Sequence, residues 1–583
     1  MNDMASSRRG FMAAFARLGL GTTLLPGVLW SQLAAAGTQS ATVAMIKDAA
    51  RLSGLEFSDE ECTAIVDGVN ANLNRIVALH EIKIPNDVAP PFYFSPLTPG
   101  MKVDGAAKPF RASKPRPVRR PPDLEQVAFW PVTDLAELVR TRAVTSTELT
   151  QMYLARLHRY NEKLNFVVTF LDDVALTQAK RADEEIAAGR YKGPLHGIPW
   201  GAKDIMTFKG YKTTWGSGAY QDQMLENTAS VIELLTDAGA VLLAKLTTGE
   251  LAGGDQWFGG RTNNPWNLEE GSSGSSAGPA SATAAGCVGF ALGTETGGSI
   301  LSPSGRCGAT GLRPTFGRVS RYGVMALSWT QDRIGPICRS VEDCALVMRV
   351  IARPDGRDLS VTDVPFNWDA QVDPHTLKMG YLAGAFADAD RDPEWAEIDA
   401  RTIAHLRGKG FDLVPVEVPK FPTDLLRLSV ESAVFHDELL RSGRYKQMTN
   451  KTRGERMRNA RVIPAVEYLQ SQRMRSLMML ELAKATAHVD VYLAPSTHGS
   501  PRREGERADS NAPELDTQRH SNMANLACYP AVALPSGFLA NGAPTSVSFM
   551  AQPYREAALL AVAKAYQDDT GFHRRPPPLF AVT

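Results

Sequence analysis

A stretch rich in small residues, 271–323, constrains the fold of this chain more than any other part of the sequence. Glycine, serine, alanine and threonine dominate it, and such a composition is also typical of a flexible linker. Apolar residues alternate with the small ones, however, so residues 289–293 predict a short buried strand and residues 279–287 a tightly packed helix. The sequence therefore predicts that this stretch lies in the core of a folded domain.

The tetrapeptide Thr296-Gly297-Gly298-Ser299 follows the predicted strand directly. A Gly-Gly pair lets the backbone turn sharply and point several N–H groups at one spot. Such a cluster can stabilise the oxyanion that forms when a serine attacks a carbonyl group. Taken alone, the tetrapeptide is more often a tight turn with a surface hydroxyl, so the choice depends on other residues.

Two upstream residues supply groups that serine chemistry requires. Ser275 lies 24 residues before Ser299, and Lys203 follows an apolar run bounded by proline and glycine. A lysine in that place is either a surface residue whose stem covers apolar groups or a base whose burial favours the neutral amine. Taken alone, Lys203 fits the surface interpretation better.

Four blocks of sequence carry a resemblance to a known family. In chain order they read GPLHGIPWGAKD, NPWNLEEGSSGSSAGPASATAAG, ALGTETGGSI and CGATGLRPTFGRVSRYG. With these blocks the chain resembles the amidase signature family over roughly residues 126–583. The resemblance implies an α/β class and the amidase-signature fold, in which helices surround a central mixed β-sheet.

The resemblance assigns roles residue by residue. The family uses a Ser–cis-Ser–Lys triad, which implies that Ser299 is the nucleophile, Ser275 the bridging cis-serine and Lys203 the base. A serine hydroxyl is a weak nucleophile that needs a neighbouring base, and lysine can act as that base only when it is neutral. Ser275 can accept a proton from Ser299 and pass one to Lys203, because a hydroxyl both donates and accepts hydrogen bonds.

The resemblance also implies the groups that surround the reacting carbonyl. The backbone N–H groups of Thr296, Gly297, Gly298 and Ser299 would form the oxyanion hole. Trp329, which lies between two further family blocks, either lines the acyl pocket or is an ordinary core tryptophan. We expect no cofactor, and the ten histidines show no metal-ligand spacing.

Two features depart from the family pattern. The glycines around the first serine pair are partly replaced, and Leu301 stands where the family carries an arginine after the nucleophile. Glu295 therefore needs another cation or water as its partner. Residues 274–278 also match the G-x-S-x-G nucleophile elbow, but that motif follows a strand, whereas the polar residues 267–271 predict a turn.

The first 36 residues are typical of an export signal. The sequence SRRGFM begins a twin-arginine pattern at Ser7, a mildly apolar run follows over residues 13–29, and residues 34–36 are alanines. A basic, frayed N-terminus is the alternative. Arg17 and several glycines argue against a membrane-spanning helix. We therefore expect the twin-arginine export machinery to deliver the protein to the periplasm, with cleavage near Ala36 and no stable membrane span.

The rest of the chain divides into three predicted segments. Residues 37–84 predict a small helical N-terminal extension in which Ser58 caps a helix. Residues 85–125 hold 10 of the 37 prolines together with basic residues, and they predict a Pro-rich basic linker. That linker is either a solvated strap or a segment that contacts anionic surfaces. Residues 126–583 form the predicted amidase signature catalytic domain.

Charge and cysteine content limit the possible partners. The formal net charge is zero, so we expect no nucleic-acid partner. Export permits disulfides, but the spacing of the six cysteines matches no zinc module and favours buried free thiols. The oligomeric state is not predicted.

Three functions compete. The first is an exported hydrolase that cleaves the C(O)–N bond of a small-molecule or peptide-like amide. The second is an A-type amidotransferase subunit that hydrolyses glutamine for tRNA-linked synthesis, and the predicted export argues against it. The third is a non-catalytic amidase-like binding protein, which Leu301 and the replaced glycines suggest. The retention of Lys203, Ser275 and Ser299 argues against the third function.

Overall fold

The computed structural model describes residues 40–52, 55–80, 94–421, 423, 429–460, 463–498 and 516–582. The predicted export signal, residues 1–36, lies outside these residues. Contacts between residues divide the chain into two compact units. The smaller unit comprises Met1–Val88, Arg427–Tyr445 and Thr452–Ser471, and the larger unit comprises Ala89–Leu426, Lys446–Lys451 and Gln472–Thr583.

The smaller unit is helical wherever it has regular structure in the described residues. Helices α3 (Val43–Leu52) and α4 (Asp59–His80) pack against each other. The predicted cap of α4 is confirmed, because Ser58 Oγ accepts the Glu61 N–H while the Glu61 carboxylate accepts the Ser58 N–H. The other helices with residues in this unit are α14 (Ser429–Phe435), α15 (Asp437–Arg441), α16 (Lys451–Ala460) and the first part of α17 (Ala465–Ala485).

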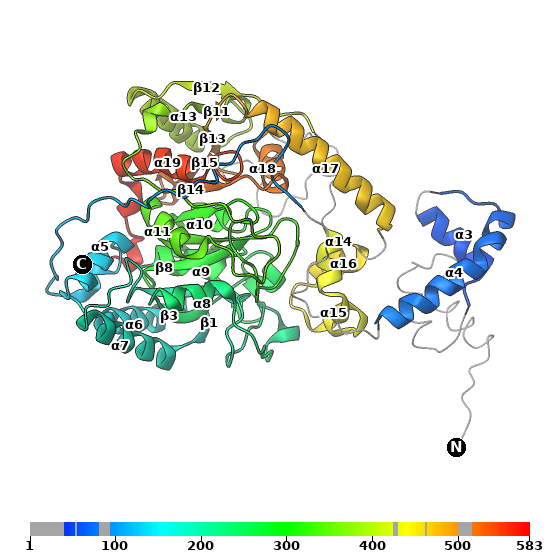
Figure 1. Ribbon diagram of the computed structural model, residues 1–583, viewed down its shortest axis with the longest axis horizontal. Helices are drawn as coiled ribbons and strands as arrows, with labels where there is room; N and C mark the ends of the chain where they lie inside the picture. Colours follow the sequence, from blue (N-terminus) through cyan, green and yellow to red (C-terminus); the bar gives the residue numbers. More distant parts are fainter. Residues whose placement is uncertain are drawn as a thin grey trace, which may run out of the picture. The chain divides into compact units, whose positions relative to one another are not determined.

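A mixed eleven-stranded sheet forms the centre of the larger unit, which confirms the predicted fold class (Figure 1). In spatial order its strands are β1 (Val167–Phe170), β3 (Val241–Leu246), β2 (Pro199–Lys203), β8 (Phe290–Glu295), β10 (Arg333–Cys338), β9 (Thr310–Arg313), β14 (Ala531–Phe538), β15 (Pro544–Met550), β13 (Val491–Pro495), β11 (Met379–Leu382) and β12 (Leu413–Val416). Strand β2 is parallel to both of its neighbours, β3 and β8, whereas β8 and β10 are antiparallel.

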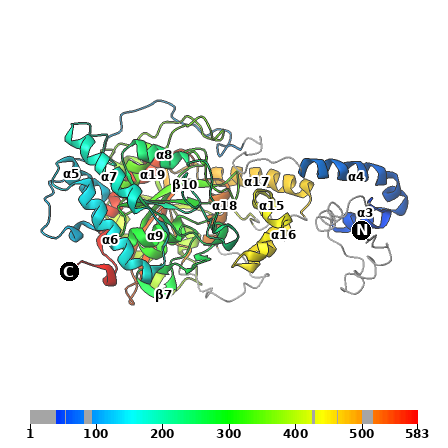
Figure 2. The same cartoon turned by 90° about the horizontal axis from the view of Figure 1, so that it is seen from below.

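Helices surround this sheet (Figures 1 and 2). They are α5 (Val132–Arg140), α6 (Ser146–Leu164), α7 (Asp172–Ala187), α8 (Ser230–Asp237), α9 (Ala277–Ala284), α10 (Leu301–Cys307), α11 (Val341–Ile351), α12 (Ala383–Phe386), α13 (Pro393–Gly408), α18 (Asp516–Leu526) and α19 (Glu556–Thr570). Helices α6 and α7 lie side by side, as both views show. Of the described helices, none combines the length and the apolar character that a membrane crossing requires.

The strands next to the predicted site are buried throughout. Every residue of β2, β3 and β8 is buried, as expected for parallel strands that helices cover on both faces. Trp200 of β2 stacks on Phe290 of β8, with 5.8 Å between ring centroids. This packing holds β2 and β8 together next to Lys203 and Thr294, which lie at the ends of the two strands.

Two local predictions differ from the structure. The helix predicted over 279–287 is α9, which begins at Ala277 and ends at Ala284. The turn predicted over residues 267–271 is wrong, because these residues form strand β7 (Asn267–Gly271), which pairs with β6 (Asn263–Asn264) outside the main sheet. The polar residues fit a strand here because this two-stranded ribbon is only partly buried.

The described part of the predicted linker, residues 94–125, belongs to the larger unit. We call residues 106–120 the strap. Its backbone contacts the rest of the unit, since the Arg111 N–H donates to the Trp368 carbonyl and the Ser113 N–H donates to the Glu342 carboxylate at 2.5 Å. The strap is therefore an ordered part of the larger unit.

Candidate active site

The site lies at the edge of the sheet where parallel strands β2 and β8 both end. Lys203 is the last residue of β2, and Thr294 is the second-last residue of β8. Because the strands are parallel neighbours, their carboxyl ends meet at one edge, where α/β proteins commonly place binding sites. Lys203 is fully buried there.

Lys203 contacts three hydroxyl groups. Its Nζ lies 2.8 Å from Ser275 Oγ, 2.8 Å from Thr294 Oγ1 and 3.3 Å from Ser276 Oγ. Burial penalises the charged ammonium. The three hydroxyl partners can accept from an ammonium and can also donate to a neutral amine, so they allow either form. Burial is therefore the feature that suits Lys203 to act as an uncharged base.

The two predicted serines come together through their backbones. The Ser276 N–H donates to the Ser299 carbonyl at 3.1 Å, which places Ser299 beside the Ser275–Ser276 segment. The peptide bond between Gly274 and Ser275 is cis. Glycine is required at position 274, because a Cβ there would lie 2.0 Å from the Gly254 carbonyl oxygen. Ser275 is 1% exposed whereas Ser299 is only half-buried, so a substrate can reach Ser299.

The described residues show three consecutive backbone N–H groups without an acceptor, ending with that of Ser299 itself. Within the described residues, the N–H groups of Gly297, Gly298 and Ser299 have no acceptor. Gly298 has a φ of +96°, a conformation that favours glycine. Consecutive unpaired N–H groups next to a nucleophile are available to stabilise a developing oxyanion.

The peptide group between Thr296 and Gly297 is held by two side chains. Its carbonyl oxygen accepts a hydrogen bond from Gln331 Nε2 at 2.6 Å and another from Arg333 Nη2 at 2.9 Å. In a trans peptide the N–H points away from the carbonyl, so these two donors also orient the Gly297 N–H. The Thr296 hydroxyl donates to Asp332, which fixes the same residue from its other side.

Glu295, for which the sequence indicated no cationic partner, forms an ion pair with Arg313. It is fully buried, and its Oε1 pairs with Arg313 Nη1 at 2.7 Å. Its Oε2 accepts the Ile300 N–H at 2.7 Å and the Leu301 N–H at 2.9 Å. Burial raises the pKa of Glu295, but Arg313, Arg333 and the Leu301 N–H outweigh it and lower the pKa below its ordinary value. Arg313 thus replaces the arginine that Leu301 removes.

A second guanidinium lies close to Glu295. Arg333 is buried, and burial lowers its pKa to about 10, so it remains charged at neutral pH. Its Nε and Nη1 have no partner within the described residues. Glu295 forms its ion pair with Arg313, whereas Arg333 contacts the carbonyl of the peptide that carries the Gly297 N–H and so places a positive charge next to that peptide.

A second buried lysine lies next to the site, and the sequence analysis did not identify it. Lys245 Nζ pairs with Asp204 Oδ1 at 2.8 Å, and both side chains are fully buried. The Nζ of Lys245 also donates to Thr213 Oγ1 at 3.0 Å, and within the described residues no contact joins it to the two predicted serines, so this lysine belongs to the support of the site. Asp204 also accepts the Thr214 N–H at 3.0 Å, so the pair fixes the chain that directly follows Lys203.

The remaining predictions concern Trp329, metals and cysteines. Trp329 is half-buried, in the loop that also carries Gln331, and its role in an acyl pocket stays a prediction. The described residues contain no group of three side chains that could hold a metal ion. All six cysteines are buried free thiols, as predicted. No sequence pattern indicated Thr294, Gln331, Arg333 or Arg313, because their contacts join positions far apart in the chain.

Comparisons with known proteins identify the family of this chain. The family model described as Amidase matches residues 148–560. The A-type subunit of glutamyl-tRNA(Gln) amidotransferase from Roseiflexus sp. (strain RS-1) is 34% identical over 480 residues, which cover 77% of this chain and 98% of that protein. The corresponding protein of Geobacter metallireducens is 32% identical over 476 residues, or 76% and 97% of the two chains.

Solved structures of amidases are also similar to this chain. The peptide amidase of Stenotrophomonas maltophilia superposes with a TM-score of 0.67 at 30% identity, over 78% of this chain and 99% of that one. A bacterial aryl acylamidase has a TM-score of 0.68 over 77% and 99% of the chains, and at 20% identity it shows the shared fold alone. The fold, the buried lysine–serine edge and these matches show that the chain belongs to the amidase signature family.

Proposed function

We propose that this chain hydrolyses the C(O)–N bond of an amide through an acyl-enzyme on Ser299. The observation that carries the proposal is the contact between buried Lys203 and Ser275, next to three unpaired N–H groups. The three roles assigned to Lys203, Ser275 and Ser299 are part of the proposal.

The first half of the reaction forms the acyl-enzyme. Ser299 Oγ attacks the amide carbon while its proton passes to Ser275 Oγ and the Ser275 proton passes to neutral Lys203. The carbonyl oxygen becomes an oxyanion, and the N–H groups of Gly297 and Gly298 stabilise it. The proton then returns from Lys203 through Ser275 to the amide nitrogen, the C–N bond breaks, and the amine or ammonia leaves.

The second half releases the acid. Water attacks the Ser299 ester while one of its protons passes through Ser275 to Lys203, and a second oxyanion forms in the same place. When this oxyanion collapses, the bond to Ser299 Oγ breaks and the serine recovers its proton. The acid leaves, and the site returns to its starting state.

Two substrate classes have support. The curated relatives are named as glutamyl-tRNA(Gln) amidotransferase subunits, at up to 34% identity among those compared, so they favour the side-chain amide of glutamine over the exported hydrolase. The word subunit in their name implies partner chains. A peptide amide is the second candidate, because the peptide amidase of Stenotrophomonas maltophilia is similar at 30% identity.

Ammonia release separates these two classes. The purified full-length chain is incubated with glutamine and, separately, with a peptide that carries a C-terminal amide. Release from glutamine alone supports the amidotransferase class, and release from the peptide amide alone supports the hydrolase class. If neither these amides nor an aryl amide is hydrolysed, the chain is a binding protein and the proposed function is wrong.

Export remains a proposal that rests on the sequence of residues 1–36. It can be tested by fractionation of bacterial cells that express the full chain. Recovery from the periplasm, with loss of export when Arg8 and Arg9 are both replaced by lysine, supports export. Recovery only from the cytoplasm contradicts it and fits the amidotransferase class.

Replacing Lys203 by methionine is expected to lower kcat by about 10³-fold or more, because Ser275 loses the group that takes its proton. Methionine fills a similar volume, so the buried edge stays packed. The matched control is Lys209→Met, since Lys209 is exposed, and there we expect full activity. The measurement is kcat on the best amide substrate, and equal activity of both variants would remove Lys203 from the mechanism.

A further inference from the structure

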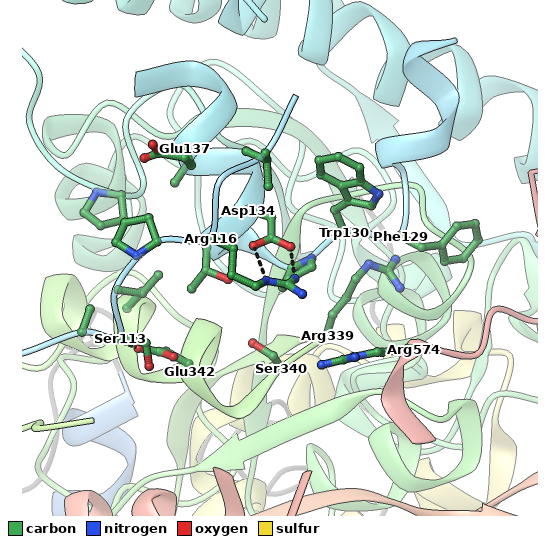
Figure 3. A pocket seen from close by; sticks show the side chains of 18 of the residues that line it. Ser113, Arg116, Phe129, Trp130, Asp134, Glu137, Arg339, Ser340, Glu342 and Arg574 are labelled. Carbon is green, nitrogen blue, oxygen red and sulfur yellow. Dashed lines mark hydrogen bonds and ion pairs between the residues drawn. The ribbon is translucent and has the colours of Figure 1, made fainter. Parts of the chain in front are cut away.

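A cavity of about 870 Å³ lies in the larger unit, and none of the candidate active-site residues lines it (Figure 3). The strap forms one wall, helix α5 a second, and the residues around the start of α11 a third. The end of α19 and the segment from His573 to Val582 complete it. Its volume suits a small organic molecule.

Most of this cavity is built from segments that the family match does not include. The Amidase model matches residues 148–560. The strap and α5 precede that region, and Lys564, His573 and Arg574 follow it. The cavity therefore lies largely outside the part of the chain that the family model describes.

The carboxylates in the cavity wall are all paired with cations. Arg116 pairs with Asp134, Arg140 with Glu137, and Lys564 with Glu342 and Asp568. Three more cations line the wall, and within the described residues Lys114, Arg339 and Arg574 have no carboxylate partner. The wall thus carries an excess of positive charge.

Arg339 and His573 decide how much of this excess charge is present at neutral pH. Arg339 is 8% exposed, its guanidinium lies 4.8 Å from the centre of the Phe129 ring, and its Nε has no partner in the described chain. Burial lowers its pKa to about 10, which leaves it charged at neutral pH. Burial, followed by the charges of Arg574 and Arg339, lowers the pKa of His573 to about 4, so His573 is neutral.

Aromatic rings and prolines form the apolar part of the wall. Phe129 and Trp130 follow one another just before α5, and Tyr191 lies on the same cavity. In Figure 3, Arg116, Arg339 and Arg574 approach the cavity from three different segments, close to Ser340. Guanidinium groups bind carboxylate and phosphate through paired hydrogen bonds, and aromatic rings pack on flat apolar groups.

We propose that this cavity binds a small organic anion, in which a phosphate or carboxylate contacts Arg339 and Arg574 and a flat apolar body lies against Trp130. The proposal is independent of the amide reaction, because none of these residues contacts Lys203, Ser275 or Ser299 among the contacts of the described residues.

The test is isothermal titration of the full chain at low ionic strength with phenyl phosphate, benzoate and inorganic phosphate. We expect phenyl phosphate or benzoate to bind one site, and whichever of the two binds more tightly identifies the head group. Weaker binding at high salt is expected, because part of the attraction is between solvent-accessible charges. If neither organic anion binds, or if inorganic phosphate binds as tightly as both, the proposal is wrong.

Arg574→Gln locates the site, and Arg575→Gln is its matched control. Arg574 is exposed, so its replacement leaves the fold intact. Arg575 is the next residue but lies over the rings of Trp266 and Phe538, at 6.0 and 4.3 Å from their centres. We expect Arg574→Gln to weaken binding about tenfold through the loss of one charge-assisted hydrogen bond. Equal binding by the two variants would overturn the proposal, and amide turnover should be unchanged in both.

Discussion

Replacing Ser299 by alanine is expected to lower kcat for amide hydrolysis by on the order of 10⁴-fold or more and to leave the fold intact. The large effect follows from the loss of the oxygen atom that carries the acyl group in the proposed mechanism. The small effect on folding follows from the position of Ser299, which is only half-buried. The measurements are kcat and the melting temperature of the purified protein.

Ser302→Ala is the matched control for this variant. Ser302 lies three residues further along the same segment, and its hydroxyl contacts Ser273 and His498. We expect less than about tenfold loss of kcat, since this hydroxyl is not in the proposed proton path. A serine-reactive fluorophosphonate should label Ser299 in the wild-type protein and in Ser302→Ala. Labelling at Ser276 instead would contradict the assignment and support the nucleophile elbow.

Replacing Glu295 by glutamine is expected to lower the free energy of unfolding by about 3–5 kcal/mol, the typical cost of removing one partner from a buried ion pair. The variant leaves the buried Arg313 without its carboxylate partner and removes a negative charge close to Arg333. It also leaves the Ile300 and Leu301 N–H groups with a weaker, uncharged acceptor. The measurement is the melting temperature across a pH series.

The pH dependence follows from the direction of the pKa shift. The folded protein holds the pKa of Glu295 below 4.5, so the stabilisation from the carboxylate is fully present above that pH and is lost as the pH falls through the folded pKa. The difference in melting temperature between wild type and Glu295→Gln should therefore be constant from pH 8 to about pH 5 and should become smaller in more acidic solution. A difference that grows toward low pH would contradict the ion pair.

Glu233→Gln provides the control for stability. Glu233 pairs with Arg357 at the surface, where the two side chains are 42% and 36% exposed. Exposed pairs contribute about 0–1 kcal/mol, so we expect a small change in melting temperature. If Glu295→Gln were as mild as Glu233→Gln, the buried pair would not stabilise the segment that carries Ser299.

Local patterns predicted much of the fold. The cap at Ser58 lies within four residues of sequence, and the helix and strand predicted within residues 279–293 come from a local alternation of small and apolar residues. A cap or an apolar alternation involves residues that are close in sequence, so it can be predicted without knowledge of tertiary contacts. The polar strand β7 was missed because its pairing partner, rather than its own composition, makes it a strand.

The candidate site could be predicted only in part. The resemblance supplied Lys203, Ser275 and Ser299, and the structure brings their segments together. No local pattern indicated that Arg313, on a different strand, would pair with Glu295, since that contact depends on how β9 lies in the sheet. The cavity under the strap was also not predictable, because residues more than 200 positions apart form its walls.

The hydrogen bonds from Gln331 and Arg333 to the Thr296 carbonyl would couple the fit of a substrate in the site to its turnover number. Gln331 lies two residues after Trp329 and Arg333 begins β10, so, on the prediction that Trp329 lines the acyl pocket, an ill-fitting amide that displaces this stretch would tilt the Gly297 peptide plane. The tilt turns the Gly297 N–H away from the negative charge that develops during attack, so the oxyanion is less stabilised. Binding of the unreacted amide, which carries no such charge, weakens much less. Poor substrates should therefore differ from good ones in turnover number more than in Michaelis constant.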